Sequence, residues 1–196
     1  MQQYIAERFR NAFSGLSLDT EALRRYSDVI DLSIGDTDFT TDRRIIDAAY
    51  ADACAGYTHY GDPKGDPELI EAICQAWKED FNQDVSPAEV LVTTSSCMGM
   101  SQALLALLNP GDEVLIPTPC WVSYADYNNQ IYLAGGKMVE VVTKEENHYA
   151  PEEATIRAAI TPRTRAMIVN TPCNPTGAAY SMETLTMLAK LATEYD

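Results

Sequence analysis

Three neighbouring residues, Ser95, Ser96 and Cys97, stand where a strand-like pattern gives way to a helix-like one. The apolar run EVLVT precedes them, and the segment SCMGMSQALLALL that follows predicts a helix beginning among them. The first backbone N–H groups of a helix have no intrahelical acceptor, and together with the helix dipole they attract phosphate. Serine at this position is also an ordinary N-cap, so the pattern alone leaves both interpretations open.

Two further segments place chemically useful side chains after apolar runs. PTPCWVSY follows EVLIP and carries Trp121, whose indole could stack on a planar aromatic ligand or fill a core. NTPCNPTG follows RAMIV and carries Asn174, whose side-chain amide can donate a hydrogen bond to a fixed oxygen. A bare Asn-Pro pair predicts only a turn, whereas the whole string is more specific.

The order of these runs predicts how the motifs are positioned. EVLVT, EVLIP, KMVEVV and RAMIV alternate with helix-like stretches, which is typical of βαβ units. We therefore expect an α/β fold with a mostly parallel sheet and flanking helices. Loops that follow parallel strands gather at one edge of the sheet, where ligands bind. The three motifs are expected at that edge.

The rest of the chain supplies helices and their caps. Residues 2–13 and 19–26 predict a helical N-terminal segment, and residues 29–34 predict a short strand. Asp66 and Pro67 predict the start of a helix with Leu69, Ile70, Ile73 and Trp77 on one face. Ser181 predicts the N-cap of the last helix.

Composition restricts the class of ligand. The formal net charge of -15 disfavours nucleic acid and anionic membranes, and no window approaches the roughly 20 apolar residues of a membrane span. We expect a cytoplasmic protein acting on small molecules. The 5 cysteines form no C-x-x-C pair, and neither His59 nor His148 has a second histidine or a cysteine nearby at metal-ligand spacing. Reduced thiols and no metal are expected. G-x-G-x-x-G and G-x-x-x-x-G-K-[ST] are both absent, which excludes those two phosphate loops.

Several motifs in this order carry a family resemblance. YGDPKGDPEL at residues 60–69, NPGDEV at residues 109–114, PCWVSY and NTPCNPTG are similar to those of the class I/II aminotransferases, a family of fold-type I pyridoxal-phosphate enzymes. The resemblance extends from about Ile30 to the end of the chain. It implies that residues 31–196 are part of a pyridoxal-phosphate-binding large domain, and that residues 1–30 are a helical small-domain or dimer-arm segment.

The resemblance also implies the roles of single residues. Ser95, Ser96 and Cys97 match the positions that bind the phosphate of pyridoxal 5'-phosphate. Trp121 matches the aromatic residue stacked on the pyridine ring, and Asn174 matches the asparagine that bonds the phenolic oxygen.

The resemblance assigns roles to two positions nearer the N-terminus as well. Tyr60 matches the tyrosine that reaches the phosphate of the neighbouring subunit, which implies a homodimer. Gly35 matches the glycine that lines the substrate carboxylate pocket.

The implied activity is transfer of an amino group between an amino acid and a 2-keto acid. The Schiff-base lysine of the family is expected beyond Asp196, so this chain resembles the N-terminal half only and is expected to be inactive alone. Two alternatives stay open. Another fold-type I enzyme, such as a carbon–sulfur lyase or a decarboxylase, would share the binding motifs, and a short chain could bind a ligand or partner without catalysis. Aspartate and aromatic amino acids fit as donors by analogy only.

Overall fold

The computed structural model describes residues 4, 25, 26, 28, 30, 35–125 and 130–196. From residue 25 onward, the described residues divide into two compact units between Thr93 and Thr94, called here the N-terminal unit and the sheet unit. Apart from isolated positions, the predicted helices at residues 2–13 and 19–26 and the predicted strand at residues 29–34 lie outside the described residues.

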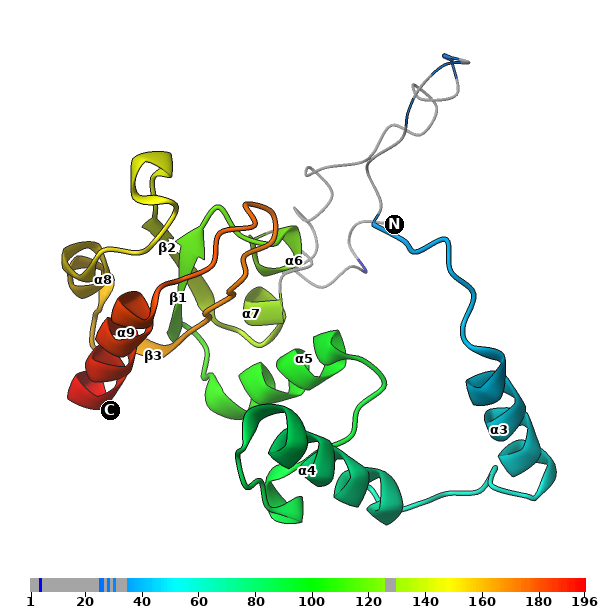
Figure 1. The fold of residues 1–196 in the computed structure, drawn as a ribbon. Helices are drawn as coiled ribbons and strands as arrows, with labels where there is room; N and C mark the ends of the chain where they lie inside the picture. The colour runs from blue at the N-terminus through cyan, green and yellow to red at the C-terminus, as the bar shows by residue number, and fades with distance from the viewer. Residues whose placement is uncertain (1–3, 5–24, 27, 29, 31–34, 126–129) are drawn as a thin grey trace. The chain divides into compact units, whose positions relative to one another are not determined.

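Helices and strands alternate along the sheet unit, as Figure 1 shows. In chain order the elements are α3 (Arg43–Cys54), α4 (Pro67–Phe81), the 3-10 helix η2 (Pro87–Glu89), α5 (Ser96–Leu107), β1 (Glu113–Thr118), α6 (Val122–Ala125), α7 (Gln130–Leu133), β2 (Lys137–Val142), the 3-10 helix η3 (Glu145–Asn147), α8 (Glu153–Ala159), β3 (Thr164–Met167) and α9 (Met182–Tyr195).

The N-terminal unit confirms the predicted start of α4. The Asp66 carboxylate accepts hydrogen bonds from the N–H groups of Glu68 (2.9 Å) and Leu69 (3.3 Å), and Pro67 is the first helical residue. Such a cap contributes on the order of 1 kcal/mol to stability. The predicted apolar face is only partly covered, because Ile70 is buried whereas Leu69 and Trp77 are 46% and 44% exposed.

The predicted strand EVLVT does not form. Ser86 and Glu89 instead make a capping box around η2, in which the Glu89 carboxylate accepts from the Ser86 N–H at 2.8 Å. Further along, the Val92 N–H donates to the carbonyl oxygen of Lys64 at 2.8 Å. The N–H groups of Val90 and Val92 therefore bond within the N-terminal unit, and none of the described strands pairs with this segment.

The other three predicted strands form a parallel sheet with the order β2-β1-β3. KMVEVV coincides with β2, and its register with β1 runs from Glu113↔Lys137 to Thr118↔Val142. β1 is central and four of its six residues are buried, as expected for a parallel strand covered on both faces. The predicted α/β class is confirmed.

Alternate residues of β1 supply the two cores of the sheet unit. Val114 and Ile116 pack with the helices α5 and α7, while Leu115 packs on the opposite face with α8 and α9. The first core comprises Leu104, Leu108, Val114, Ile116, Ile131 and Ile168. The second comprises Leu115, Val141, Ile156, Leu188 and Leu191. This three-layer arrangement holds the carboxyl ends of β1 and β3 side by side.

None of the helices in the described part of the chain combines the length and apolar character needed to cross a membrane.

Candidate functional site

The N-terminus of α5 combines a serine cap with exposed backbone donors. The Ser95 hydroxyl oxygen accepts from the Met98 N–H at 3.2 Å, so the predicted N-cap forms. Ser96 and Cys97 begin the helix and both are exposed. Their N–H groups have no acceptor among the described residues, as is usual for the first helical positions. At the start of α5 the Met98 N–H is therefore capped, whereas the N–H groups of Ser96 and Cys97 have no partner among the described residues.

The loop after β1 positions an aromatic pair. Trp121 is half-buried, and its ring meets that of Tyr124 edge to face, with 5.4 Å between the ring centroids and 88° between the planes. The Tyr124 N–H donates to the Trp121 carbonyl oxygen at 2.9 Å, which begins the short helix α6. The indole is therefore oriented by its contact with the tyrosine ring.

The loop after β3 is held by its own hydrogen bonds. The Asn170 side-chain oxygen accepts from the Asn174 N–H at 3.0 Å, and the Cys173 N–H donates to the Ala178 carbonyl oxygen at 2.9 Å. The Tyr180 N–H donates to the Thr171 hydroxyl at 2.8 Å. Asn174 is exposed, and its side-chain amide has no hydrogen-bond partner among the described residues. The backbone at Asn174 is fixed while its side-chain amide stays available.

These three segments meet around Tyr124. The Cys173 thiol donates to the carbonyl oxygen of Pro119 at 3.5 Å, which joins the loop after β3 to the loop after β1. Burial raises the pKa of the Tyr124 hydroxyl, and the nearby thiols of Cys120, Cys97 and Cys173 raise it further. Cys97 belongs to the start of α5, Cys120 to the loop after β1 and Cys173 to the loop after β3. Tyr124 therefore lies within electrostatic range of all three segments.

The remaining predicted residues belong to the N-terminal unit. Tyr60 and Gly35 are both exposed there, and no described atom lies within 4 Å of a Cβ built on Gly35. Their assignment to the phosphate and to the substrate carboxylate stays a prediction.

All of the lysines in the chain are exposed. Lys78 pairs with the Asp84 carboxylate at 2.8 Å within the N-terminal unit. The full set is Lys64, Lys78, Lys137, Lys144 and Lys190. None of them lines the small cavity beside Tyr124. The described residues contain no group of three or more His, Cys, Asp or Glu side chains that could hold a metal ion.

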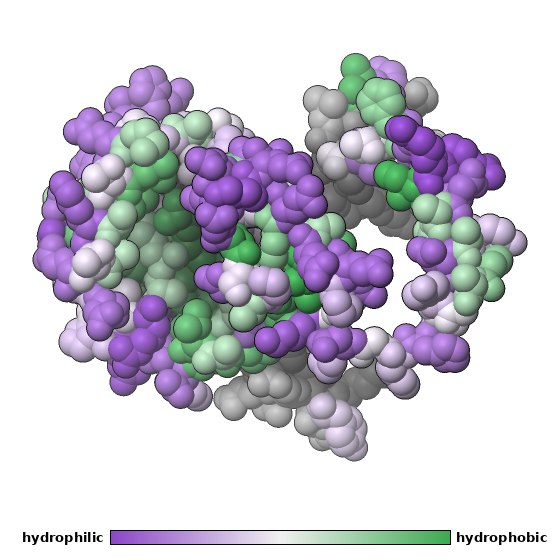
Figure 2. Space-filling view, turned by 60° about the horizontal axis from the view of Figure 1, so that its bottom comes forward, coloured by the Kyte–Doolittle hydropathy of each residue, from purple (hydrophilic) through white to green (hydrophobic). Residues whose placement is uncertain are grey.

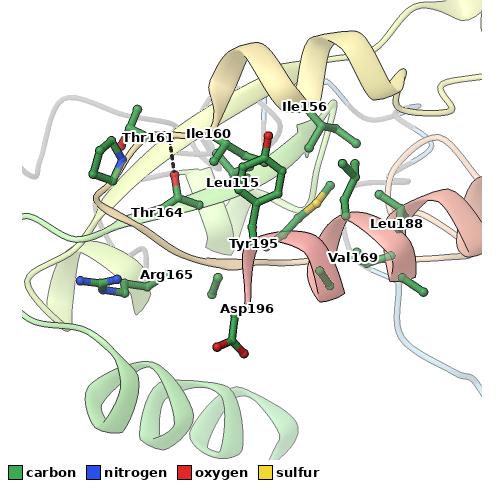
Figure 3. A pocket seen from close by; sticks show the side chains of 16 residues that line it. Leu115, Ile156, Ile160, Thr161, Thr164, Arg165, Val169, Leu188, Tyr195 and Asp196 are labelled. Carbon is green, nitrogen blue, oxygen red and sulfur yellow. Dashed lines mark hydrogen bonds between the residues drawn. The ribbon is translucent and has the colours of Figure 1, made fainter.

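A groove of about 750 Å³ lies elsewhere in the sheet unit, between the open edge of β3, the end of α8 and α9. Figure 2 shows hydrophobic residues gathered in a hollow with a hydrophilic rim. Figure 3 shows Leu115, Ile156 and Leu188 close to the Tyr195 ring. Since these walls belong to the second core, and none of the predicted site residues lines the groove, we interpret it as uncovered core.

Comparison of the sequence with known protein families identifies the family of this chain. The profile described as "Aminotransferase class I and II" matches residues 27–196. The chain belongs to the class I and II aminotransferase family. It is 40% identical over 176 residues to the aspartate/prephenate aminotransferase of Thermus thermophilus, covering 90% of this chain and 45% of that protein. It is 40% identical over 169 residues to the aspartate aminotransferase of Bacillus subtilis, covering 86% and 42%.

Solved structures of aminotransferases share the fold. A single mutant of the Thermus thermophilus aspartate aminotransferase matches with a TM-score of 0.88 at 37% identity, covering 98% of this chain and 51% of that one. The aromatic aminotransferase of Pyrococcus horikoshii matches with a TM-score of 0.80 at 39% identity, covering 90% and 47%. The chain therefore spans about half the length of these relatives.

Sequence reasoning did not identify Tyr124, Cys120 and Cys173 as parts of the site. The segment PCWVSY did contain Tyr124, three residues after Trp121, so a signal existed in the motif itself. The approach of Cys173 to Pro119 depends on the pairing of β1 with β3, which no local pattern shows.

Proposed function

We propose that this chain forms the cofactor-binding part of a pyridoxal-phosphate-dependent aminotransferase, which moves an amino group between an amino acid and a 2-keto acid. The observation that supports this best is the meeting of the α5 start, the Trp121 loop and the Asn174 loop around Tyr124. Their meeting brings exposed backbone donors, an aromatic ring and a side-chain amide to one edge of the sheet, and these are the groups that a planar phosphorylated cofactor would use.

The donor set fits the cofactor. The exposed N–H groups of Ser96 and Cys97 suit a phosphate, with the positive end of α5 adding to the attraction. The Trp121 ring offers a flat face, and the Asn174 amide offers an N–H donor to an oxygen on the ring. Ser95 already caps Met98, so its hydroxyl contributes by shaping the loop.

Pyridoxal 5'-phosphate, when bound, supplies an aldehyde that takes up the amino group and a ring that accepts the electron pair left at the α-carbon. The residues of this chain bind and orient that group. Tyr60, from a second subunit of a homodimer, and Gly35, at the substrate carboxylate, complete the proposed set. The lysine that would carry protons at the α-carbon is not among the exposed lysines of this chain.

The substrates and the cellular setting are part of the proposal. The relatives are named aspartate or aspartate/prephenate aminotransferases, so aspartate is the first donor to assay. A cytoplasmic location follows from the expected reduced thiols and from the acidic composition.

Tryptophan fluorescence tests the proposal in this chain. The sequence contains 2 tryptophans, Trp77 and Trp121, so Trp77→Phe leaves Trp121 as the only emitter. We expect pyridoxal 5'-phosphate to quench that emission saturably, because the cofactor would stack on the indole. Inorganic phosphate should reverse the quenching, because it would compete for the α5 start.

The matched control is Trp121→Phe, in which Trp77 of α4 reports. Its emission should fall only in proportion to the added cofactor, without saturation. Circular dichroism of both variants checks that the helices are retained. Equal, unsaturated quenching of the two variants would contradict the assignment of Trp121 to the cofactor site.

A further inference from the structure

Two cysteines on neighbouring loops lie close together beneath the candidate site. Cys120 follows β1 and Cys173 follows β3, and these two strands are directly paired. Both cysteines are half-buried free thiols. They line one small cavity together with Tyr124 and Tyr180.

The hydrogen bond from Cys173 to Pro119 limits the distance between Cys173 and Cys120. The Cys173 sulfur lies 3.5 Å from the Pro119 carbonyl oxygen, and that oxygen belongs to the peptide unit that joins Pro119 to Cys120. Standard backbone dimensions put such an oxygen roughly 3 Å from the next Cα. The Cys173 sulfur is therefore within about 6.5 Å of the Cys120 Cα.

That distance suits a disulfide after side-chain rotation. A cysteine sulfur lies roughly 2.8 Å from its own Cα, so rotation of the Cys120 side chain can bring the two sulfur atoms to within about 4 Å of each other, and a small backbone shift would then complete the S–S bond. The cavity that both residues line measures about 10 Å³, which is room for about one water molecule. Among the described residues, no larger water-filled space keeps the two side chains apart.

We propose that Cys120 and Cys173 are a modification site, at which hydrogen peroxide produces a reversible disulfide between the Trp121 loop and the Asn174 loop. Peroxide transfers one oxygen to the Cys173 thiolate, its O–O bond breaks, and the first water leaves. The Cys120 thiolate then attacks the Cys173 sulfur, the S–S bond forms, the S–O bond breaks, and hydroxide takes up a proton and leaves as the second water. Two thiols lose two electrons and one peroxide gains them.

The order of the two steps follows from the surroundings of Cys120. Burial raises the pKa of the Cys120 thiol, with further contributions from Cys173 and from Glu140 on β2. The thiolate is the nucleophile, so Cys120 is slow to react with peroxide and acts second, when the Cys173 sulfur is beside it.

Thiol titration and peptide mass analysis test this site without any cofactor, so the result does not depend on the proposed function. After peroxide treatment and its removal, the 5 titratable thiols of the folded chain should fall to three, and reductant should restore all of them. Non-reducing digestion should give one linked peptide pair containing Cys120 and Cys173, lighter by two hydrogens than the free peptides.

Single variants identify the partners. Cys120→Ser should stop the reaction at a sulfenic acid on Cys173, which dimedone traps, and Cys173→Ser should leave Cys120 as a thiol. Cys97→Ser is the matched control, because Cys97 also lies near Tyr124, and it should still give the linked pair. A linkage through Cys97, or a thiol count that stays at five in the folded chain, would overturn the proposal.

Discussion

The 196-residue polypeptide, supplied with pyridoxal 5'-phosphate and aspartate, is expected to form keto acid no faster than the free cofactor does. Covalent catalysis of this kind needs a lysine at the cofactor, both as nucleophile and as proton carrier. Every lysine of this chain is exposed, and none lines the cavity beside Tyr124. Since enzymes commonly accelerate reactions by about a million-fold or more, the expected loss is of that order.

The assay is keto acid formation, with the complete Thermus thermophilus relative as the positive control. Borohydride treatment of the cofactor-loaded chain provides a second readout, because it fixes any lysine–cofactor linkage for mass analysis. We expect no single lysine to be labelled preferentially. Enzyme-like turnover together with specific labelling of one lysine, for example Lys144 or Lys190, would show that the catalytic lysine is present in this chain.

Changing Asn174 to Asp is expected to weaken pyridoxal 5'-phosphate binding by about 10- to 100-fold in the Trp77→Phe reporter. The Asn174 amide is exposed and has no partner among the described residues, which leaves its N–H donor for the cofactor oxygen. A carboxylate has no donor and repels a phenolate. Hydrogen bonds to charged groups contribute about 1.5–3 kcal/mol, and every 1.4 kcal/mol is about tenfold in affinity.

The substitution should leave the loop intact, because it is the Asn174 backbone N–H, and not the side chain, that bonds to Asn170. The matched control is Asn147→Asp, since Asn147 is also an exposed asparagine. Asn147 is the last residue of η3, and its side-chain amide donates to the carbonyl oxygen of Ala150, in the following loop, at 3.2 Å. Fluorescence titration should give an unchanged dissociation constant for this control. Equal affinities in both variants and in the parent would remove Asn174 from the site.

Local signals in the sequence predicted several elements of both units. The N-caps at Asp66 and Ser181 formed as predicted, because a cap depends on bonds that span two or three residues. The bounds of β2 followed from its apolar run. The convergence of loops after β1 and β3 was also predictable, since it follows from the parallel direction of the strands.

The features that the sequence did not predict depend on contacts between residues that are far apart in the chain. EVLVT has a strand pattern, but Val92 found its acceptor at Lys64, and a strand needs a neighbour as well as a pattern. Leu69 and Trp77 have the spacing of a buried face and yet remain largely exposed, because burial depends on what packs against the helix. The approach of Cys173 to Pro119 depends in the same way on two strands that are distant in sequence.

The groove beside β3 has a consequence for the thermodynamics of unfolding. The denaturant dependence of the unfolding free energy and its heat-capacity change both scale with the surface that becomes exposed when the chain unfolds. The groove-lining residues Tyr195 and Val169 are already 49% and 41% exposed in the folded chain, so only part of their surface adds to either quantity. We therefore expect the sheet unit to unfold over a broader range of urea concentration than a closed domain with the same number of residues.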